Sequence, residues 1–138
     1  MPKKDSKKEA IQQIKLCCTA LWGGKAENLK ILDLNGMSSV TDFFVIASGM
    51  SEPHLRALRR AIEGTLRENS IGVHGIEAET GTGWMVIDAF DFMVHLFLPE
   101  VRDRYRLESL WKDALEIKVE KEDTKDLSPS EGPLRSTR

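Results

Sequence analysis

The sequence predicts one small α/β domain, with a mixed central sheet flanked by helices. The chain of 138 residues has the length of one ordinary domain, which excludes a multidomain enzyme. Segments with helical periodicity alternate with short apolar runs typical of strands, in the order helix, strand, strand, helix, three strands and helix. We expect the folded domain to span residues 9–117, between a flexible basic N-terminus at 1–8 and a disordered charged tail at 118–138.

The first third of the chain reads as a helix followed by two strands. Residues 9–22 carry an apolar stripe at helical spacing, and Gly23-Gly24 ends the pattern. Residues 28–34 form a strand candidate, and the turn residues at 35–39 follow it. The run from Phe43 to Ala47 is entirely apolar, which is typical of a strand buried on both faces. This run therefore predicts a central strand of the sheet.

The second helix has a clear start and a clear apolar face. Ser51 is a good N-cap and Pro53 suits the first turn. The core side is predicted to carry Leu55, Leu58, Ile62 and Leu66. The opposite side carries Arg56, Arg60, Glu63 and Arg67. This opposite side reads as an ordinary solvated surface, with a small basic patch as the alternative.

The remaining elements are shorter. We expect a strand near residues 73–77, and a hairpin in which residues 84–88 pair with residues 91–98 up to Pro99. Residues 100–115 should form one or two helical turns and a short helix. Its apolar anchors would be Tyr105, Leu107, Leu110 and Trp111.

The hairpin predicts one apolar face and one mixed face. If Ala89-Phe90 is the turn, Asp88 lies opposite Asp91, and the alternation of strand side chains groups six residues on one side. This expected mixed face comprises Trp84, Val86, Asp88, Asp91, Met93 and His95. The other side carries only Met85, Ile87, Phe92, Val94 and Leu96, so it must face the core.

The charges point to the same part of the chain. No Lys or Arg occurs between Arg67 and Arg102, whereas six acidic residues do, although the whole chain has a net charge of only −2. An acidic surface with a Trp and a Met is a plausible binding site for a basic protein partner. The alternative is that Trp84 packs on the first helix and the carboxylates keep a sheet edge soluble.

Composition excludes several other classes. The small net charge provides no general field for nucleic acid. The longest apolar stretches, residues 43–47 and 92–98, are too short to span a membrane, so we expect a cytoplasmic protein. The adjacent Cys17 and Cys18 cannot form an ordinary disulfide, and the ligand spacings of a metal site are absent. We therefore expect no metal and no cofactor.

Catalytic interpretations are weaker. The segment from Ser48 to Ser51 joins a strand to a helix N-terminus, a geometry that binds phosphate, but it lacks the glycine pattern and the lysine of nucleotide loops. Asp42 or Asp88 could hold Mg²⁺ beside it. A nucleotidyl- or phosphoryl-transferring enzyme is therefore the alternative function. A third possibility is a dimerisation module whose hairpin face is only a self-interface.

Several short sequence motifs closely resemble those of the ribosomal silencing factor family (RsfS, iojap-like). They occur in order and at the expected spacings over about residues 9–114. They include residues 32–34, 38–51, 83–88, 91–97 and 105–111. The resemblance implies a nucleotidyltransferase-like fold without the catalytic residues. It also implies binding to the large ribosomal subunit, chiefly through the basic ribosomal protein numbered fourteen, so that the small subunit cannot join and translation is repressed. Members are often homodimeric when free.

The resemblance carries a partner-binding role to residues of the mixed face and no catalytic role to any residue. The expected contacts are Trp84, Asp88, Asp91, Met93, His95 and Tyr105. A minor contact of the arginine-bearing helix with ribosomal RNA remains an open alternative. The chain departs from the family at Ala89-Phe90, where relatives often carry a glycine turn, so Phe90 is a further candidate contact.

Overall fold

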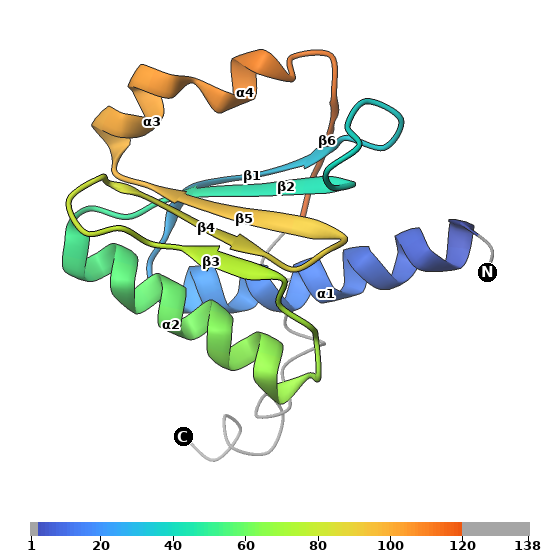
Figure 1. Cartoon of the computed structure of the whole chain (residues 1–138), viewed down its shortest axis with the longest axis horizontal. Helices are drawn as coiled ribbons and strands as arrows, with labels where there is room; N and C mark the ends of the chain where they lie inside the picture. The colour runs from blue at the N-terminus through green and yellow to red at the C-terminus, as the bar shows by residue number, and fades with distance from the viewer. Residues whose placement is uncertain (1–2, 120–138) are drawn as a thin grey trace.

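The computed structural model describes residues 3–119 and has the predicted architecture, a small α/β domain with a mixed sheet. The six strands lie in the order β3-β4-β5-β2-β1-β6. Helices α1 and α2 cover one face of the sheet, and the shorter α3 and α4 lie over the other (Figure 1). The strands are β1 (Glu27–Asp33), β2 (Phe43–Ser48), β3 (Gly75–Glu77), β4 (Trp84–Asp88), β5 (Phe92–Phe97) and β6 (Leu115–Ile117), and the helices are α1 (Lys3–Gly23), α2 (Glu52–Glu68), α3 (Pro99–Tyr105) and α4 (Leu107–Leu110).

Strand β2 is central, as its continuous apolar run predicts. It pairs in parallel with β5 and antiparallel with β1, and all six of its residues are buried. The parallel pair places the ends of β2 and β5 at the same edge of the sheet, where Ser48 faces Phe97. Side chains of these two strands pack against α1 and α2 on one face of the sheet and against α3 and α4 on the other.

Helix α2 begins and packs as predicted. The Ser51 side chain accepts a hydrogen bond of 3.2 Å from the backbone N–H of His54, which caps the first turn. The four predicted core leucine and isoleucine side chains are fully buried. On the opposite side, Arg60 and Arg67 are exposed, and the side chain of Arg59 lies 3.4 Å from that of Glu63.

The structure differs from the expectation at the start of the domain, and the expected tail lies almost entirely outside the described residues. Helix α1 begins at Lys3, so residues 3–8, expected to be a flexible terminus, are helical. Lys7 is held there by an ion pair of 2.9 Å with the nearly buried Asp33. The expected tail begins at Lys118, but residues 120–138 lie outside the described residues.

The hairpin register differs from the expected one by two residues. Asp88 pairs with Met93, Val86 with His95 and Trp84 with Phe97, so the loop contains residues 89–92. A four-residue loop keeps the parity of the side chains, and the apolar face is core as predicted. Asp91 leaves the strand and does not face Asp88.

A second apolar cluster lies on the α3–α4 side of the sheet, and sequence reasoning missed it. Its buried members are Leu32, Leu34, Phe44, Ile46, Phe97, Val101 and Leu107. Of the expected anchors in residues 100–115, only Leu107 is buried and Trp111 half-buried, whereas Tyr105 is 52% exposed and Leu110 73% exposed. The end of this segment is a strand, β6, which pairs with β1.

Both cysteines are buried and free. Burial, together with the neighbouring Cys18, raises the pKa of Cys17 well above its usual range, and burial raises that of Cys18 to about 12. Their thiols are therefore protonated and unreactive at neutral pH. No helix in residues 3–119 is long and apolar enough to cross a membrane.

Candidate interaction surface

The mixed face lies on the α3–α4 side of the sheet. We use this name for the outward side of β4 and β5 that carries Trp84, Val86, Asp88, Met93 and His95. The helices cover the Phe97 end of it, because Phe97 is buried in the second cluster with Val101 and Leu107. Trp84, Val86, Asp88 and Met93 remain half-buried. The mixed face is therefore partly open to a partner.

Trp84 is the centre of this surface. Its indole stacks on Phe97, with ring centroids 4.9 Å apart and an angle of 28° between the rings. Its second aromatic neighbour is Tyr105, with ring centroids 4.9 Å apart and an angle of 43° between the rings. The alternative that Trp84 packs on the first helix is wrong, because its partners belong to the opposite side of the sheet. The ring is held firmly while part of its surface stays accessible.

His95 holds the Trp84 indole in place through a hydrogen bond. The Trp84 indole N–H donates a hydrogen bond of 3.2 Å to His95 Nδ1, so the imidazole is neutral and carries its proton on Nε2. Burial lowers the pKa of His95 to about 4, and its Nε2 has no hydrogen-bond partner among the described residues. His95 is only 5% exposed. Its hydrogen bond positions the Trp84 indole, and its expected contact with a partner stays a prediction.

Tyr105 comes from a separate element, because it is the last residue of α3, and the structure places its ring beside that of Trp84. Helix α3 approaches the start of β4 closely at Gly83, where a Cβ atom would lie only 2.7 Å from Val101 Cγ2. The next residue, Arg106, has φ +49°, in the left-handed region, which ends the helix and turns the chain into α4. The Tyr105 ring therefore borders the mixed face.

The two hairpin aspartates have different roles. Asp88 Oδ1 accepts a hydrogen bond of 2.9 Å from the backbone N–H of Phe90, so its carboxylate caps the hairpin loop. Asp91 is exposed at the tip, where partial burial and the charges of Asp42 and Glu9 raise its pKa. The expected mutual repulsion of Asp88 and Asp91 is replaced by repulsion between Asp91 and carboxylates of other segments.

Phe90 is an exposed apolar side chain at the same tip. It is 56% exposed, and its ring meets that of His74 with centroids 5.0 Å apart. Its φ of +71° lies in the left-handed region, where a glycine is the natural residue. The backbone at Phe90 therefore has a conformation that a glycine adopts without strain, although the residue is a phenylalanine.

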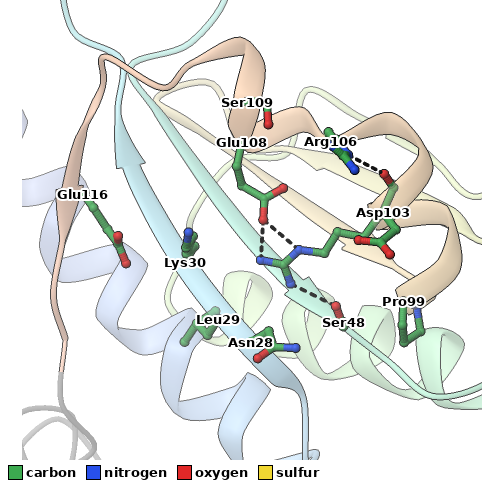
Figure 2. Close-up of a pocket in the computed structure, with 11 residues that line it drawn as sticks. Asn28, Leu29, Lys30, Ser48, Pro99, Asp103, Arg106, Glu108, Ser109 and Glu116 are labelled. Atoms are coloured by element: carbon green, nitrogen blue, oxygen red, sulfur yellow. Dashed lines mark hydrogen bonds and ion pairs between the residues drawn. The ribbon is translucent and has the colours of Figure 1, made fainter.

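A separate hollow of about 670 Å³ lies between β1, α3 and α4 (Figure 2). Arg102 dominates it, donating to Glu108 at 2.9 and 3.0 Å and to Ser48 Oγ at 2.9 Å. Burial alone would raise the pKa of Glu108. Hydrogen bonds from the backbone and from Arg102, and the charges of Arg102 and Lys30, outweigh it and leave that pKa below its usual value. The triad is a clamp that fastens α3 and α4 to the end of β2.

This clamp bears on the enzyme alternative. The hydroxyl of Ser48 is buried and engaged by Arg102, and the hydroxyl of Ser51 caps α2. Asp42 is exposed, and Asp88 accepts from its own hairpin loop. Residues 3–119 contain no group of three or more His, Cys, Asp or Glu side chains arranged to hold a metal ion. In the enzyme alternative, Ser48, Ser51 and Asp88 would belong to the phosphate and Mg²⁺ site, but here their side chains form hydrogen bonds within the fold.

Comparison with known protein families identifies relatives over most of the chain. The family model described as "Ribosomal silencing factor during starvation" matches residues 7–137. The ribosomal silencing factor of Bacillus subtilis is 36% identical over 101 residues, covering 73% of this chain and 86% of its own length. A mouse protein named for mitochondrial assembly of the large ribosomal subunit is 33% identical over 89 residues, which are 62% of this chain and 39% of the mouse protein.

Solved structures give the same result. A Chromobacterium violaceum protein superposes with a TM-score of 0.70 at 32% identity, covering 73% of this chain and 84% of that one. A Bacillus halodurans protein superposes with a TM-score of 0.68 at 30% identity, covering 81% and 99%. The relatives of this chain in Bacillus subtilis, Halalkalibacterium halodurans and Chromobacterium violaceum are all named ribosomal silencing factors, and none of these names is that of an enzyme. The family match, the sequence relatives and the shared fold together establish that the chain belongs to the ribosomal silencing factor family.

Proposed function

We propose that this protein binds the large ribosomal subunit in the cytoplasm, chiefly through the basic ribosomal protein numbered fourteen, and so prevents the small subunit from joining. The observation that supports this most is a partly open surface in which Trp84 and Met93 come from residues 68–101, a segment without a single Lys or Arg. The ring of Tyr105, from the end of α3, adjoins Trp84 and extends this surface. Apolar rings supply the buried centre of an interface, and the surrounding carboxylates orient a basic partner.

The contributions of the mixed-face residues differ. Trp84, Met93 and Tyr105 provide contact area, and His95 keeps the indole in place through its hydrogen bond. Asp88 borders the apolar surface while it caps the hairpin loop, and Asp91 lies at the tip. Charges at the rim of an interface mainly accelerate encounter, whereas a buried aromatic anchor slows dissociation.

The proposed silencing requires occupancy alone. A domain bound at the face where the subunits meet obstructs the second subunit by its volume, and no bond is made or broken. Repression then depends on how long the protein stays bound. The contacts of Trp84 and its neighbours, which slow dissociation, therefore matter most.

The free protein is expected to be a homodimer, and the mixed face is one candidate for the self-interface. Light scattering of Trp84→Ala separates the two roles. A self-interface predicts monomers, whereas a surface reserved for the ribosome predicts intact dimers that no longer bind. A minor contact of α2 with ribosomal RNA would involve the exposed Arg60 and Arg67.

Gradient sedimentation of purified subunits tests the main proposal. Added protein should co-sediment with the large subunit and reduce the peak of joined ribosomes. Tyr105→Ala should restore joining, while the control Met50→Ala, which removes an equally exposed apolar side chain (58%, against 52% for Tyr105), should silence like the wild type. Unchanged joining at saturating wild-type protein would sink the proposal.

A further inference from the structure

A second cavity, of about 480 Å³, opens beside Trp84 between the β3–β4 edge and the end of α3. Two aromatic side chains form one side of its lining, and two carboxylates belong to the same lining. The full lining is Glu77, Ala78, Glu79, Thr82, Trp84, Val86 and Tyr105.

The aromatic side is rigid and offers ring surface rather than hydrogen bonds. The Trp84 N–H is already bonded to His95, and the indole is stacked on Phe97. Tyr105 contacts the indole at 4.9 Å and is half exposed. The electron-rich faces of tryptophan and tyrosine attract a cation that lies over them.

The carboxylates add negative charge without any internal counter-charge. Glu77 and Glu79 are exposed, and neither forms an ion pair with another residue of the described part of the chain. The cavity lining contains no Lys, Arg or His. A concave site of this kind favours a positive ligand and repels an anion.

We propose that this cavity receives an arginine side chain of the basic protein partner, which rests on the proposed function for the identity of that partner. A planar guanidinium stacks on an aromatic face and donates to carboxylates through its fork, whereas an ammonium is a more strongly hydrated point charge. Trp84 and Tyr105 would contact the guanidinium plane, and Glu77 and Glu79 would accept its N–H groups. The cavity would thereby bind one arginine side chain of the partner within the wider interface.

The test in the complex compares two variants of equal charge. Glu77→Gln with Glu79→Gln removes both cavity carboxylates, and the control Glu68→Gln with Glu100→Gln removes two exposed carboxylates of the same base-free segment that do not line the cavity. Binding of the isolated ribosomal protein numbered fourteen is measured at several salt concentrations. The cavity variant should bind at least tenfold more weakly with a flatter salt dependence, and the control should stay within about twofold. Equal losses in both variants, or wild-type affinity of the cavity variant, would overturn the proposal.

A second measurement is independent of the ribosome. N-acetyl-arginine amide is titrated into the free protein while the Trp84 indole N–H is followed by nuclear magnetic resonance, with the signal assigned by Trp84→Phe. The arginine derivative should shift this signal at millimolar concentration, and N-acetyl-norleucine amide should not. A shift together with no binding of the ribosomal protein would refute the proposed function and keep the cavity assignment. If the ribosomal protein binds, but the arginine derivative causes no shift and the cavity variant binds as the wild type does, the cavity assignment is refuted and the proposed function is kept.

Discussion

The indole N–H of Trp84 donates to Nδ1 of His95, so a half-buried aromatic anchor of the mixed face is fixed by one of the most buried polar side chains in the described domain. This bond requires a neutral imidazole, because a protonated Nδ1 has no lone pair to accept it. The protonation state of His95 therefore links the pH of the solution to the geometry of the candidate binding surface.

The first prediction concerns pH and stability. Burial lowers the pKa of His95 from 6.5 to about 4, so the unfolded chain takes up this proton first as the pH falls. The stabilising contribution is complete above pH 6.5 and is lost between pH 6.5 and 4, with a slope that approaches about 1.4 kcal/mol per pH unit. Urea unfolding from pH 4 to 8 should show this loss.

Substitution identifies the group responsible. His95→Gln should flatten the slope between pH 6.5 and 4, although it lowers stability at pH 7. The control His74→Gln changes an exposed histidine and should leave the slope as in the wild type. An unaltered slope in the His95 variant would show that another group titrates in this range.

The second prediction concerns the clamp of Arg102 with Ser48 and Glu108. Arg102→Lys keeps the charge but cannot reach both partners with a planar fork, so we expect a loss of about 2 kcal/mol in the free energy of unfolding. Amide exchange should accelerate in α4 first, because Glu108 is its attachment to α3. Exchange that accelerates evenly over the whole domain would contradict the role of a local clamp.

The same clamp has a pH signature of opposite origin to that of His95. The pKa of Glu108 lies below its usual value, so the folded state favours the charged carboxylate. Its contribution is present above the unfolded pKa, near 4.5, and disappears as the pH falls through the folded value. Glu108→Gln should abolish this acid-side loss in α4 exchange while keeping the loss due to His95.

The sequence predicts those elements whose residues determine them locally. Helix α2 has its cap, its proline and its apolar stripe within one segment, and β2 is central because six consecutive residues bury both faces. Strand β6 is different. Its three residues include an exposed leucine and a glutamate, and only pairing with β1 makes them a strand. Such a nonlocal cause leaves no periodic pattern in the sequence.

The candidate site shows the same division. Alternation along the hairpin correctly groups Trp84, Asp88, Met93 and His95 on one side of the sheet. It cannot tell which end of that side α3 will cover, so the burial of His95 is invisible before the fold is known. The pairing of residues across the hairpin depends on the conformation of the loop. Phe90 has a left-handed φ there, which a phenylalanine in the sequence does not predict.

The third prediction uses that left-handed residue. Phe90→Gly and Phe90→Ala both remove the ring that meets His74, but only glycine accepts φ +71° without strain. The glycine variant should therefore be more stable than the alanine variant by about 1 kcal/mol in thermal or urea unfolding. At Ala89, whose φ is not positive, glycine should be less stable than the native alanine. If alanine is more stable than glycine at position 90 as well as at position 89, the strain at Phe90 is contradicted.

The last prediction separates the two hairpin aspartates. Asp88→Ala removes the acceptor for the Phe90 N–H and should cost about 1 kcal/mol, whereas Asp88→Asn keeps an oxygen there and should cost less. Asp91→Asn should leave stability unchanged or higher, because the pKa of Asp91 is raised by partial burial and by the nearby Asp42 and Glu9. In the wild type, this raised pKa makes stability increase as the pH falls through the pKa of the folded carboxyl towards the lower pKa of the unfolded chain, and the Asn variant should lose that increase.

Binding distinguishes a structural carboxylate from one that faces the partner. If the hairpin tip meets a basic protein, Asp91→Asn should lower the association rate and flatten its salt dependence while the dissociation rate stays near that of the wild type, and Trp84→Phe should mainly raise the dissociation rate. Surface plasmon resonance against the isolated ribosomal protein numbered fourteen, at low and high salt, measures both rates. A variant Asp91→Asn that associates at the wild-type rate at every salt concentration would remove Asp91 from the interface and leave the apolar surface around Trp84 as its boundary.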